Sequence, residues 1–308
     1  MNRLSELLGK YEISGCCLRG KSEFALVCKN WEVDDPLVPQ ETRIITCDLS
    51  KSDTPDWSSH DIGTTTRFYC CPVSKPAEGW LFATGMGEVC FCADNKIVWE
   101  DNISDQPKNF TFSLKCIHNG YAYAVGPKRK VYRRESPGNW IKLDKGFKVS
   151  GSSTSMGFRD IDGFDESEIY ACGGDADLWR FNGDSWSQVT LPTDEYFNHV
   201  CCGKDGQVYV TTSATRYIFC GRDDQWFEIE KNDKFNEILG TITWYNDVLL
   251  LSTTKQIYEV NRSGFTPFDM TGCNIKSFSQ MTSNSDILML TSDSEVALYD
   301  GASWLHIT

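Results

Sequence analysis

The sequence predicts an all-β chain built from repeated four-stranded units, because two spacings recur along it. Pairs of short apolar runs lie eight residues apart, which suits short strands joined by tight hairpins. These pairs recur every 39 to 47 residues in the sequence. Their central residues are Leu81 and Val89, Tyr123 and Val131, Tyr170 and Leu178, Tyr209 and Tyr217, Leu249 and Ile257, and Leu288 and Val296.

Two further strands complete each unit. An aromatic residue such as Trp186 follows most pairs, just behind a turn signal such as Asn182-Gly183. Another short run with small residues, such as Cys201-Cys202, precedes each pair. A less regular unit comes before these six, and its middle hairpin carries an insertion, residues 29–42. Four-stranded antiparallel meanders with a period of about 40 residues predict a seven-bladed β-propeller.

We expect a single domain over residues 1–308, with a short helix near Leu4–Leu8. The cysteine-rich first strand of each blade is expected to line the central channel, where small side chains fit. The expected blades are approximately residues 11–64, 65–106, 107–150, 151–193, 194–233, 234–272 and 273–308.

Several short segments resemble known repeat proteins. "IYACGG" followed by Trp186 resembles a kelch blade, and "NGDSW" and "DGASW" resemble the turn of an Asp-box. No blade has the Gly-His and Trp-Asp signature of WD40 repeats. Degenerate propellers of this size and acidity also resemble immunity proteins encoded beside secreted bacterial toxins. That resemblance implies an inhibitor that sequesters a toxin.

The cysteine content predicts a reducing compartment. Disulfide scaffolds are usually small secreted chains, whereas 308 residues can bury a large core. We therefore expect the fourteen cysteines to be reduced and mostly buried. No apolar run approaches the ~20 residues of a membrane span. A cytoplasmic protein is expected, with no membrane partner.

The net charge of −13 is unevenly distributed. Residues 160–237 hold 17 Asp and Glu against 6 Lys and Arg. Such a field repels nucleic acid and steers a basic protein toward the chain. The dense basic run, residues 128–134, is interpreted as a solvated turn or as counter-charge to a neighbouring blade, with a nucleic-acid or anion contact, or a localisation signal, as the alternatives.

No motif for catalysis, a metal or a cofactor is found. The four histidines fall in four different blades, whereas a zinc enzyme brings at least three ligands together. The sequence has no Gly-x-Ser-x-Gly elbow and no Walker loop. Cys90 and Cys92 share one strand face without a second pair, which favours core packing.

A non-catalytic protein-binding propeller is therefore predicted, most specifically an inhibitor of a basic toxin. A scaffold for complex assembly is one alternative, and a glycan hydrolase or lyase in the channel mouth is another. Loops that join the second and third strands share a face with the connections between blades. The predicted partner-binding residues on that face are Trp31, Asp34, Asp35, Asp175, Asp177, Asp194, Glu195, Tyr196 and Phe197.

Overall fold

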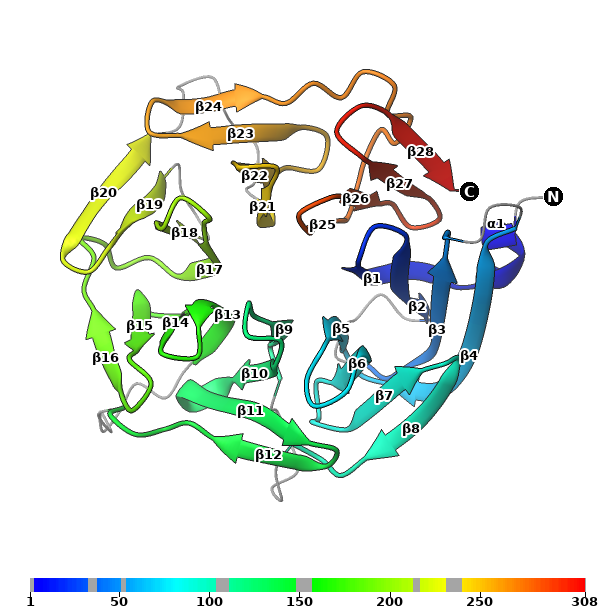
Figure 1. The fold of residues 1–308 in the computed structure, drawn as a ribbon, viewed down its shortest axis with the longest axis horizontal. Coiled ribbons are helices and arrows are strands. Elements are labelled where there is room, and N and C mark those ends of the chain that lie inside the picture. Colours follow the sequence, from blue (N-terminus) through cyan, green and yellow to red (C-terminus); the bar gives the residue numbers. More distant parts are fainter. Residues whose placement is uncertain are drawn as a thin grey trace.

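The chain was analysed as a computed structural model that describes residues 3–32, 38–50, 54–103, 111–147, 157–212, 217–230 and 240–307. In these residues, seven four-stranded antiparallel sheets form a ring around a central opening (Figure 1). The strands of each sheet pair in chain order. The chain is a seven-bladed β-propeller, as the sequence predicts.

The strand bounds of the seven blades are as follows. Blade 1 holds β1 (Glu12–Arg19), β2 (Glu23–Asn30), β3 (Gln40–Asp48) and β4 (Asp56–Thr65). Blade 2 holds β5 (Phe68–Val73), β6 (Gly79–Thr84), β7 (Val89–Ala93) and β8 (Lys96–Glu100). Blade 3 holds β9 (Ser113–Cys116), β10 (Ala122–Gly126), β11 (Lys130–Ser136) and β12 (Asn139–Lys142). Blade 4 holds β13 (Phe158–Asp165), β14 (Glu168–Gly173), β15 (Asp177–Phe181) and β16 (Trp186–Val189).

The last three blades follow the same plan. Blade 5 holds β17 (Phe197–Cys202), β18 (Val208–Thr212), β19 (Tyr217–Arg222) and β20 (Gln225–Glu230). Blade 6 holds β21 (Ile242–Tyr245), β22 (Val248–Ser252), β23 (Ile257–Asn261) and β24 (Gly264–Pro267). Blade 7 holds β25 (Gln280–Ser283), β26 (Leu288–Thr291), β27 (Val296–Tyr299) and β28 (Trp304–Ile307).

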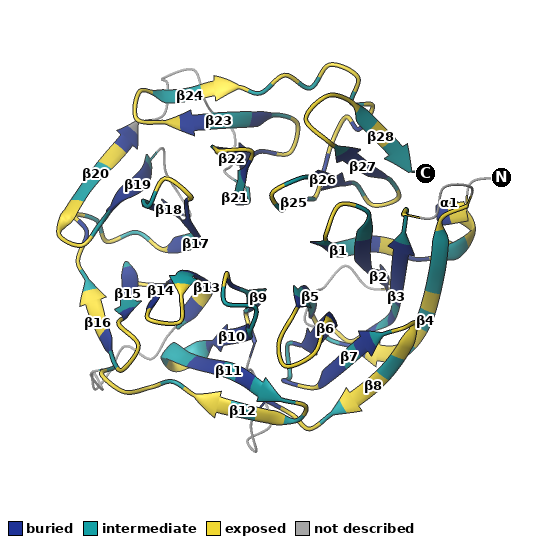
Figure 2. Ribbon diagram, viewed as in Figure 1, coloured by how far each residue is buried: buried dark blue, intermediate teal, exposed yellow. Residues whose placement is uncertain are grey.

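The first strand of each blade lies at the centre of the ring and the fourth at its rim (Figure 1). Buried residues concentrate in the middle strands, and the rim strands carry more exposed ones (Figure 2). Blade-to-blade packing is apolar: Tyr170 and Cys172 of blade 4, for example, pack with Phe197 and Val210 of blade 5. The described helices are α1 (Arg3–Leu8) and the three-residue η1 (Pro127–Arg129), and α1 is the short helix expected near Leu4–Leu8.

The ring closes by packing, because blades 1 and 7 exchange no strand. Blade 1 is entirely N-terminal and blade 7 entirely C-terminal. Leu4 and Leu8 of α1 are buried in one cluster with Met289 and Leu298 of blade 7. The Ile13 amide also donates to the carbonyl of Asp293, at 2.7 Å. Helix α1 therefore fills the junction between the first and last blades.

Ion pairs join three successive blade junctions. Between blades 2 and 3, Arg134 donates to both carboxylate oxygens of Glu100, at 2.9 and 2.5 Å. Between blades 3 and 4, Arg129 does the same to Asp177, at 2.5 and 2.9 Å. Between blades 4 and 5, Arg222 Nε donates to Glu168 at 3.0 Å. Arg129 and Arg134 belong to the basic run 128–134, so its interpretation as counter-charge to neighbouring blades is confirmed for these two residues.

The fourteen cysteines are free thiols, and ten of them are buried. Cys90 and Cys92 lie in one apolar cluster with Phe82 and Ala25, which is the packing role expected for them. Among the described helices, none has the length and apolarity to cross a membrane.

Candidate protein-binding face

Strand direction assigns every turn to one of two faces. Because each blade is an antiparallel meander, the turns between its second and third strands lie at the same end as the connections to the next blade. We call this end the insertion face, since it carries the insertion after β2. The turns between first and second strands, and between third and fourth strands, lie on the opposite face.

The structure places four predicted residues as exposed on the insertion face. Trp31 follows β2 and is 37% exposed, and Tyr196 precedes β17 and is 38% exposed. Asp175 lies in the β14–β15 turn, where both it and Ala176 have positive φ. Asp194 is exposed in the connection between blades 4 and 5.

The remaining loop positions are less accessible or are not described. Glu195 is half-buried, and its amide donates to Thr193 Oγ1 at 3.2 Å. Asp34 and Asp35 lie outside the described residues.

Two of the predicted positions were wrong, because both residues are buried in strands. Phe197 begins β17 and is fully buried, packed edge-on against Phe219. Asp177 begins β15 and is 5% exposed. Its carboxylate binds Arg129 and accepts a hydrogen bond from Trp179 Nε1 at 2.8 Å. Neither side chain is available to a partner.

The acidic stretch 160–237 is divided between the core and both faces. Four of its carboxylates are buried and structural: Asp160, Asp162, Glu168 and Asp177. Six exposed ones lie at turns of the opposite face: Asp165, Glu166, Asp184, Asp205, Asp223 and Asp224. Only Asp175, Asp194 and Glu195 of its described residues lie on the insertion face. The expectation that this charge collects on the insertion face is therefore not met.

A cavity of about 490 Å³ runs through the central channel. Its wall includes seven cysteines: Cys16, Cys17, Cys70, Cys71, Cys116, Cys201 and Cys202. The first strands of blades 1, 2, 3 and 5 therefore line the channel with thiols, as expected, whereas β13, β21 and β25 contain no cysteine and the expectation is not met for blades 4, 6 and 7. Burial raises the pKa of nearly all of these thiols, to about 11 at Cys116. Protonated thiols are poor nucleophiles and poor metal ligands.

The charged centre of the channel is Lys115. Its Nζ lies 3.8 Å from Asp160 and 3.6 Å from Asp162, and it donates to the Val200 carbonyl at 3.2 Å. Burial opposes the charge on Lys115, but the two carboxylates outweigh burial and raise its pKa. The carboxylates also accept hydrogen bonds from the Val200 and Cys202 amides, at 3.1 and 2.9 Å. Lys115 is thus a fixed ammonium that helps join blades 3, 4 and 5.

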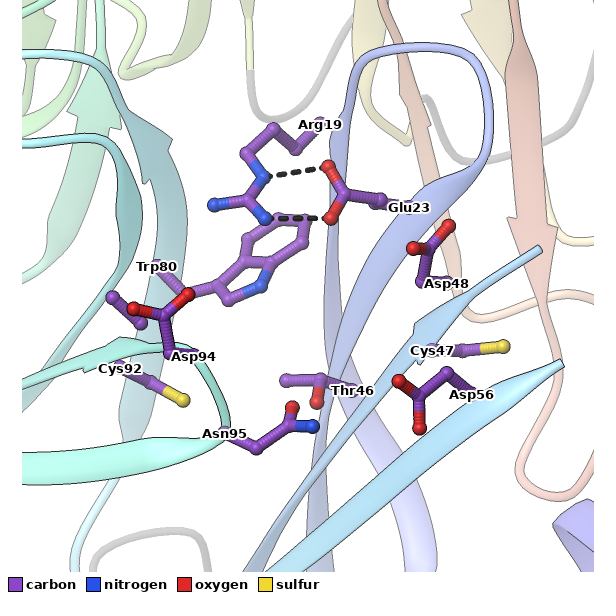
Figure 3. Close-up of a pocket in the computed structure, with 11 residues that line it drawn as sticks. Arg19, Glu23, Thr46, Cys47, Asp48, Asp56, Trp80, Cys92, Asp94 and Asn95 are labelled. Carbon is purple, nitrogen blue, oxygen red and sulfur yellow. Dashed lines mark hydrogen bonds and ion pairs between the residues drawn. The ribbon is translucent and has the colours of Figure 1, made fainter. Parts of the chain in front are cut away.

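A separate hollow of about 200 Å³ lies between blades 1 and 2 on the opposite face (Figure 3). There Arg19 binds both carboxylate oxygens of Glu23 and lies 4.9 Å from the Trp80 ring. Asp48, Asp56 and Asp94 line the same hollow (Figure 3). No group of three metal-ligating side chains suited to an ion occurs among the described residues of the chain.

A further pocket, of about 410 Å³, opens beside Trp31 at the insertion-face mouth of the channel. Arg67, Tyr69 and Phe112 line it, and Arg159 lies in the adjoining wall of the channel. None of these four residues was predicted from the sequence. A signal was present, since Arg67 directly precedes the first strand of blade 2 and Arg159 is the second residue of the first strand of blade 4.

No family model matches the chain. The immune protein Tsi7 of Pseudomonas aeruginosa is 29% identical to it over 241 residues, which are 76% of this chain and 78% of Tsi7. The chain is similar to an immune protein. This likeness agrees with the resemblance to immunity proteins inferred from the sequence.

Solved propellers share the fold at low identity. A catalytically inactive virginiamycin B lyase from Staphylococcus aureus, with quinupristin, superposes with a TM-score of 0.70 at 9% identity, covering 94% of each chain. YCF48 bound to D1 peptide superposes with a TM-score of 0.64 at 13% identity, covering 94% of this chain and 91% of that one. At such identities the likeness concerns the fold alone.

Proposed function

We propose that this chain is a non-catalytic immunity protein that binds and neutralises a toxin protein in the cytoplasm. The similarity to the immune protein Tsi7 over three quarters of the chain carries the proposal. The protonated thiols and the carboxylate-paired Lys115 of the channel support a structural role for that region. Free thiols are also what a reducing cytoplasm maintains.

The insertion face is our choice of binding surface. Trp31 and Tyr196 are exposed there, and aromatic residues supply much of the affinity of protein interfaces. Asp175, Asp194 and Glu195 would steer a basic partner toward them. Within the described residues of 160–237, the opposite face carries more exposed carboxylates than the insertion face, and these provide a matched control for charge.

Growth rescue tests the immunity function. A candidate toxin, taken from the genes that adjoin this one, is expressed in a bacterial host, with and without the chain. Rescue of growth by the intact chain is expected, together with a stoichiometric complex of the two purified proteins. Growth arrest despite normal levels of folded chain would reject an immunity role against that toxin.

Binding kinetics at two ionic strengths test the face. Trp31→Ala or Tyr196→Ala should chiefly raise the dissociation rate, at a cost of about 1–3 kcal/mol per anchor. The triple variant Asp175→Asn, Asp194→Asn, Glu195→Gln should slow association and reduce its salt dependence. The control Glu166→Gln, Asp184→Asn, Asp224→Asn removes the same charge from the opposite face and should slow association less. If the control slows association more, the binding face is the opposite one.

A further inference from the structure

The insertion-face mouth of the channel holds two arginines that have no acidic partner among the described residues. Arg67 and Arg159 are both exposed. Neither forms an ion pair within the part of the chain that the structure describes, and Arg67 interacts with the Tyr69 hydroxyl. By contrast, Arg129, Arg134 and Arg222 are paired across blade junctions. In a chain of net charge −13, two guanidinium groups at one mouth without a carboxylate partner in the described ranges need an explanation.

The backbone of Arg67 is fixed in position. Its carbonyl accepts a hydrogen bond from the Gly85 amide at 2.6 Å. The preceding residue, Thr66, is held by the buried ammonium of Lys29, which donates to the Thr66 carbonyl at 2.6 Å. Lys29 also binds the Thr65 carbonyl at 2.9 Å. The turn that presents Arg67 is therefore anchored on both sides.

Arg159 is presented by a β-bulge. Phe158 pairs with Gly173 and Asp160 with Cys172, so Arg159 is the extra residue of β13. Bulges commonly redirect a side chain next to a functional site. Both neighbours are buried, whereas Arg159 is exposed in the wall of the channel.

Tyr69 lies close enough to Arg67 and Arg159 for both charges to affect its pKa. Burial raises the pKa of its phenol, and the charges of Arg67 and Arg159 oppose that rise. The Tyr69 Oη atom is buried, and the Arg67 guanidinium interacts with it. Trp31 and Phe112, each 37% exposed, form apolar walls of the same pocket. The mouth thus combines two cations, one buried hydroxyl and two partly exposed rings.

We infer that this mouth is a subsite for a carboxylate side chain carried on an extended segment of the bound protein partner, with an aromatic or aliphatic neighbour packed on Trp31 and Phe112. A guanidinium group matches a carboxylate in charge and geometry. The Tyr69 hydroxyl would donate a further hydrogen bond. This inference rests on the proposed function. It implies that an otherwise basic toxin presents one acidic residue to the channel.

Two synthetic peptides test the subsite without the toxin. Failure of the subsite can therefore be told apart from failure of the immunity function. The acetylated peptides Ala-Phe-Glu-Phe-Ala and Ala-Phe-Gln-Phe-Ala differ by one charge and carry the same fluorophore. Fluorescence anisotropy against the full chain should show the glutamate peptide binding about tenfold more tightly, as expected for one hydrogen-bonded charge. Its affinity should fall as salt rises from 50 to 500 mM NaCl.

Matched variants locate the site. Arg67→Gln and Arg159→Gln should each weaken the glutamate peptide about tenfold. Lys204→Gln removes an exposed cation from the channel wall at the opposite face and should leave the affinity unchanged. Circular dichroism confirms that each variant is folded. Equal binding of the two peptides, no binding at all, or unchanged affinity in both arginine variants would overturn the subsite. Competition by free glutamate at equal concentration would overturn the choice of a peptide segment.

Discussion

At the scale of single residues, the buried charges of this propeller form its blade junctions. The side chains of Arg134 and Glu100 are 0% and 3% exposed and lie in adjacent blades. The Gly138 amide adds a further hydrogen bond to Glu100, at 3.1 Å. A buried pair of this kind is costly to break, because loss of one partner leaves the other charge uncompensated.

Removing one partner of that pair should therefore destabilise the chain strongly. Arg134→Met is expected to lower the free energy of unfolding by about 3–5 kcal/mol, measured by urea denaturation. The double variant Arg134→Met, Glu100→Gln should recover much of that loss. Lys145→Met breaks the exposed pair with Asp184 and should cost less than about 1 kcal/mol. Equal costs for Arg134→Met and Lys145→Met would show that the junction pair is solvated.

Residue-scale errors in the sequence analysis have physical causes. An aromatic residue near a predicted loop can be an exposed anchor or the first buried residue of a strand. Tyr196 and Phe197 are adjacent and show both outcomes. Asp177 was misplaced because its partner, Arg129, lies 48 residues away in another blade. The residues next to Asp177 in the sequence give no indication of its ion pair with Arg129.

At the scale of elements, helix α1 links the two ends of the ring. A six-residue helix is too short to be stable alone, so packing must hold it in place. Leu4 is fully buried and Leu8 is 3% exposed, against residues of blades 1 and 7. Helix α1 also lies near strand β28 in the ring (Figure 1), and Ile307 of β28 packs against the cluster that contains Leu4 and Leu8.

Shortening the Leu8 side chain of α1 should weaken the junction between blades 1 and 7. Leu8→Ala is expected to cost about 2–5 kcal/mol in chemical denaturation, because it leaves a cavity between blades 1 and 7. Leu305→Ala is the control, since Leu305 is 52% exposed on a rim strand, and it should cost less than about 0.5 kcal/mol. A similar small cost for both variants would mean that α1 does not stabilise ring closure.

The strands were predictable because each one produces a recognisable pattern in the local sequence. Apolar pairs eight residues apart and turn residues between them depend only on neighbouring residues. The face of each turn also follows from strand order. A charge count over residues 160–237 ignores that order, and so it does not show that these carboxylates are divided among the core and the two faces. The bulge that presents Arg159 leaves no such sequence pattern.

At the scale of the whole molecule, the thiols make stability sensitive to alkali. Burial raises the pKa of thirteen cysteines, to about 11 at Cys220 and about 12 at Cys47 and Cys90, whereas an unfolded thiol has a pKa of about 8.5. The folded state therefore keeps protons that the unfolded state releases. The stabilisation that the protonated thiols give the folded state is fully present below pH ~8.5 and is lost as the pH rises toward 11–12.

Thermal melts in a reducing buffer test this dependence. The melting temperature should be steady near pH 7 and fall steeply between pH 8.5 and 10. Each thiol contributes up to about 1.4 kcal/mol per pH unit in that range. Cys90→Ala should make the fall less steep by one such contribution. A melting temperature that is level across this range would show that the thiols are not shielded in the folded state.

The central claim is that this propeller holds a toxin protein against its insertion face. Hydrogen–deuterium exchange of the chain, free and in complex with the toxin that growth rescue identifies, tests that claim most directly. Slower exchange is expected in the segment after β2, in the β14–β15 turn and in residues 190–196. Unchanged exchange there, with protection of the β13–β14 and β15–β16 turns instead, would contradict it.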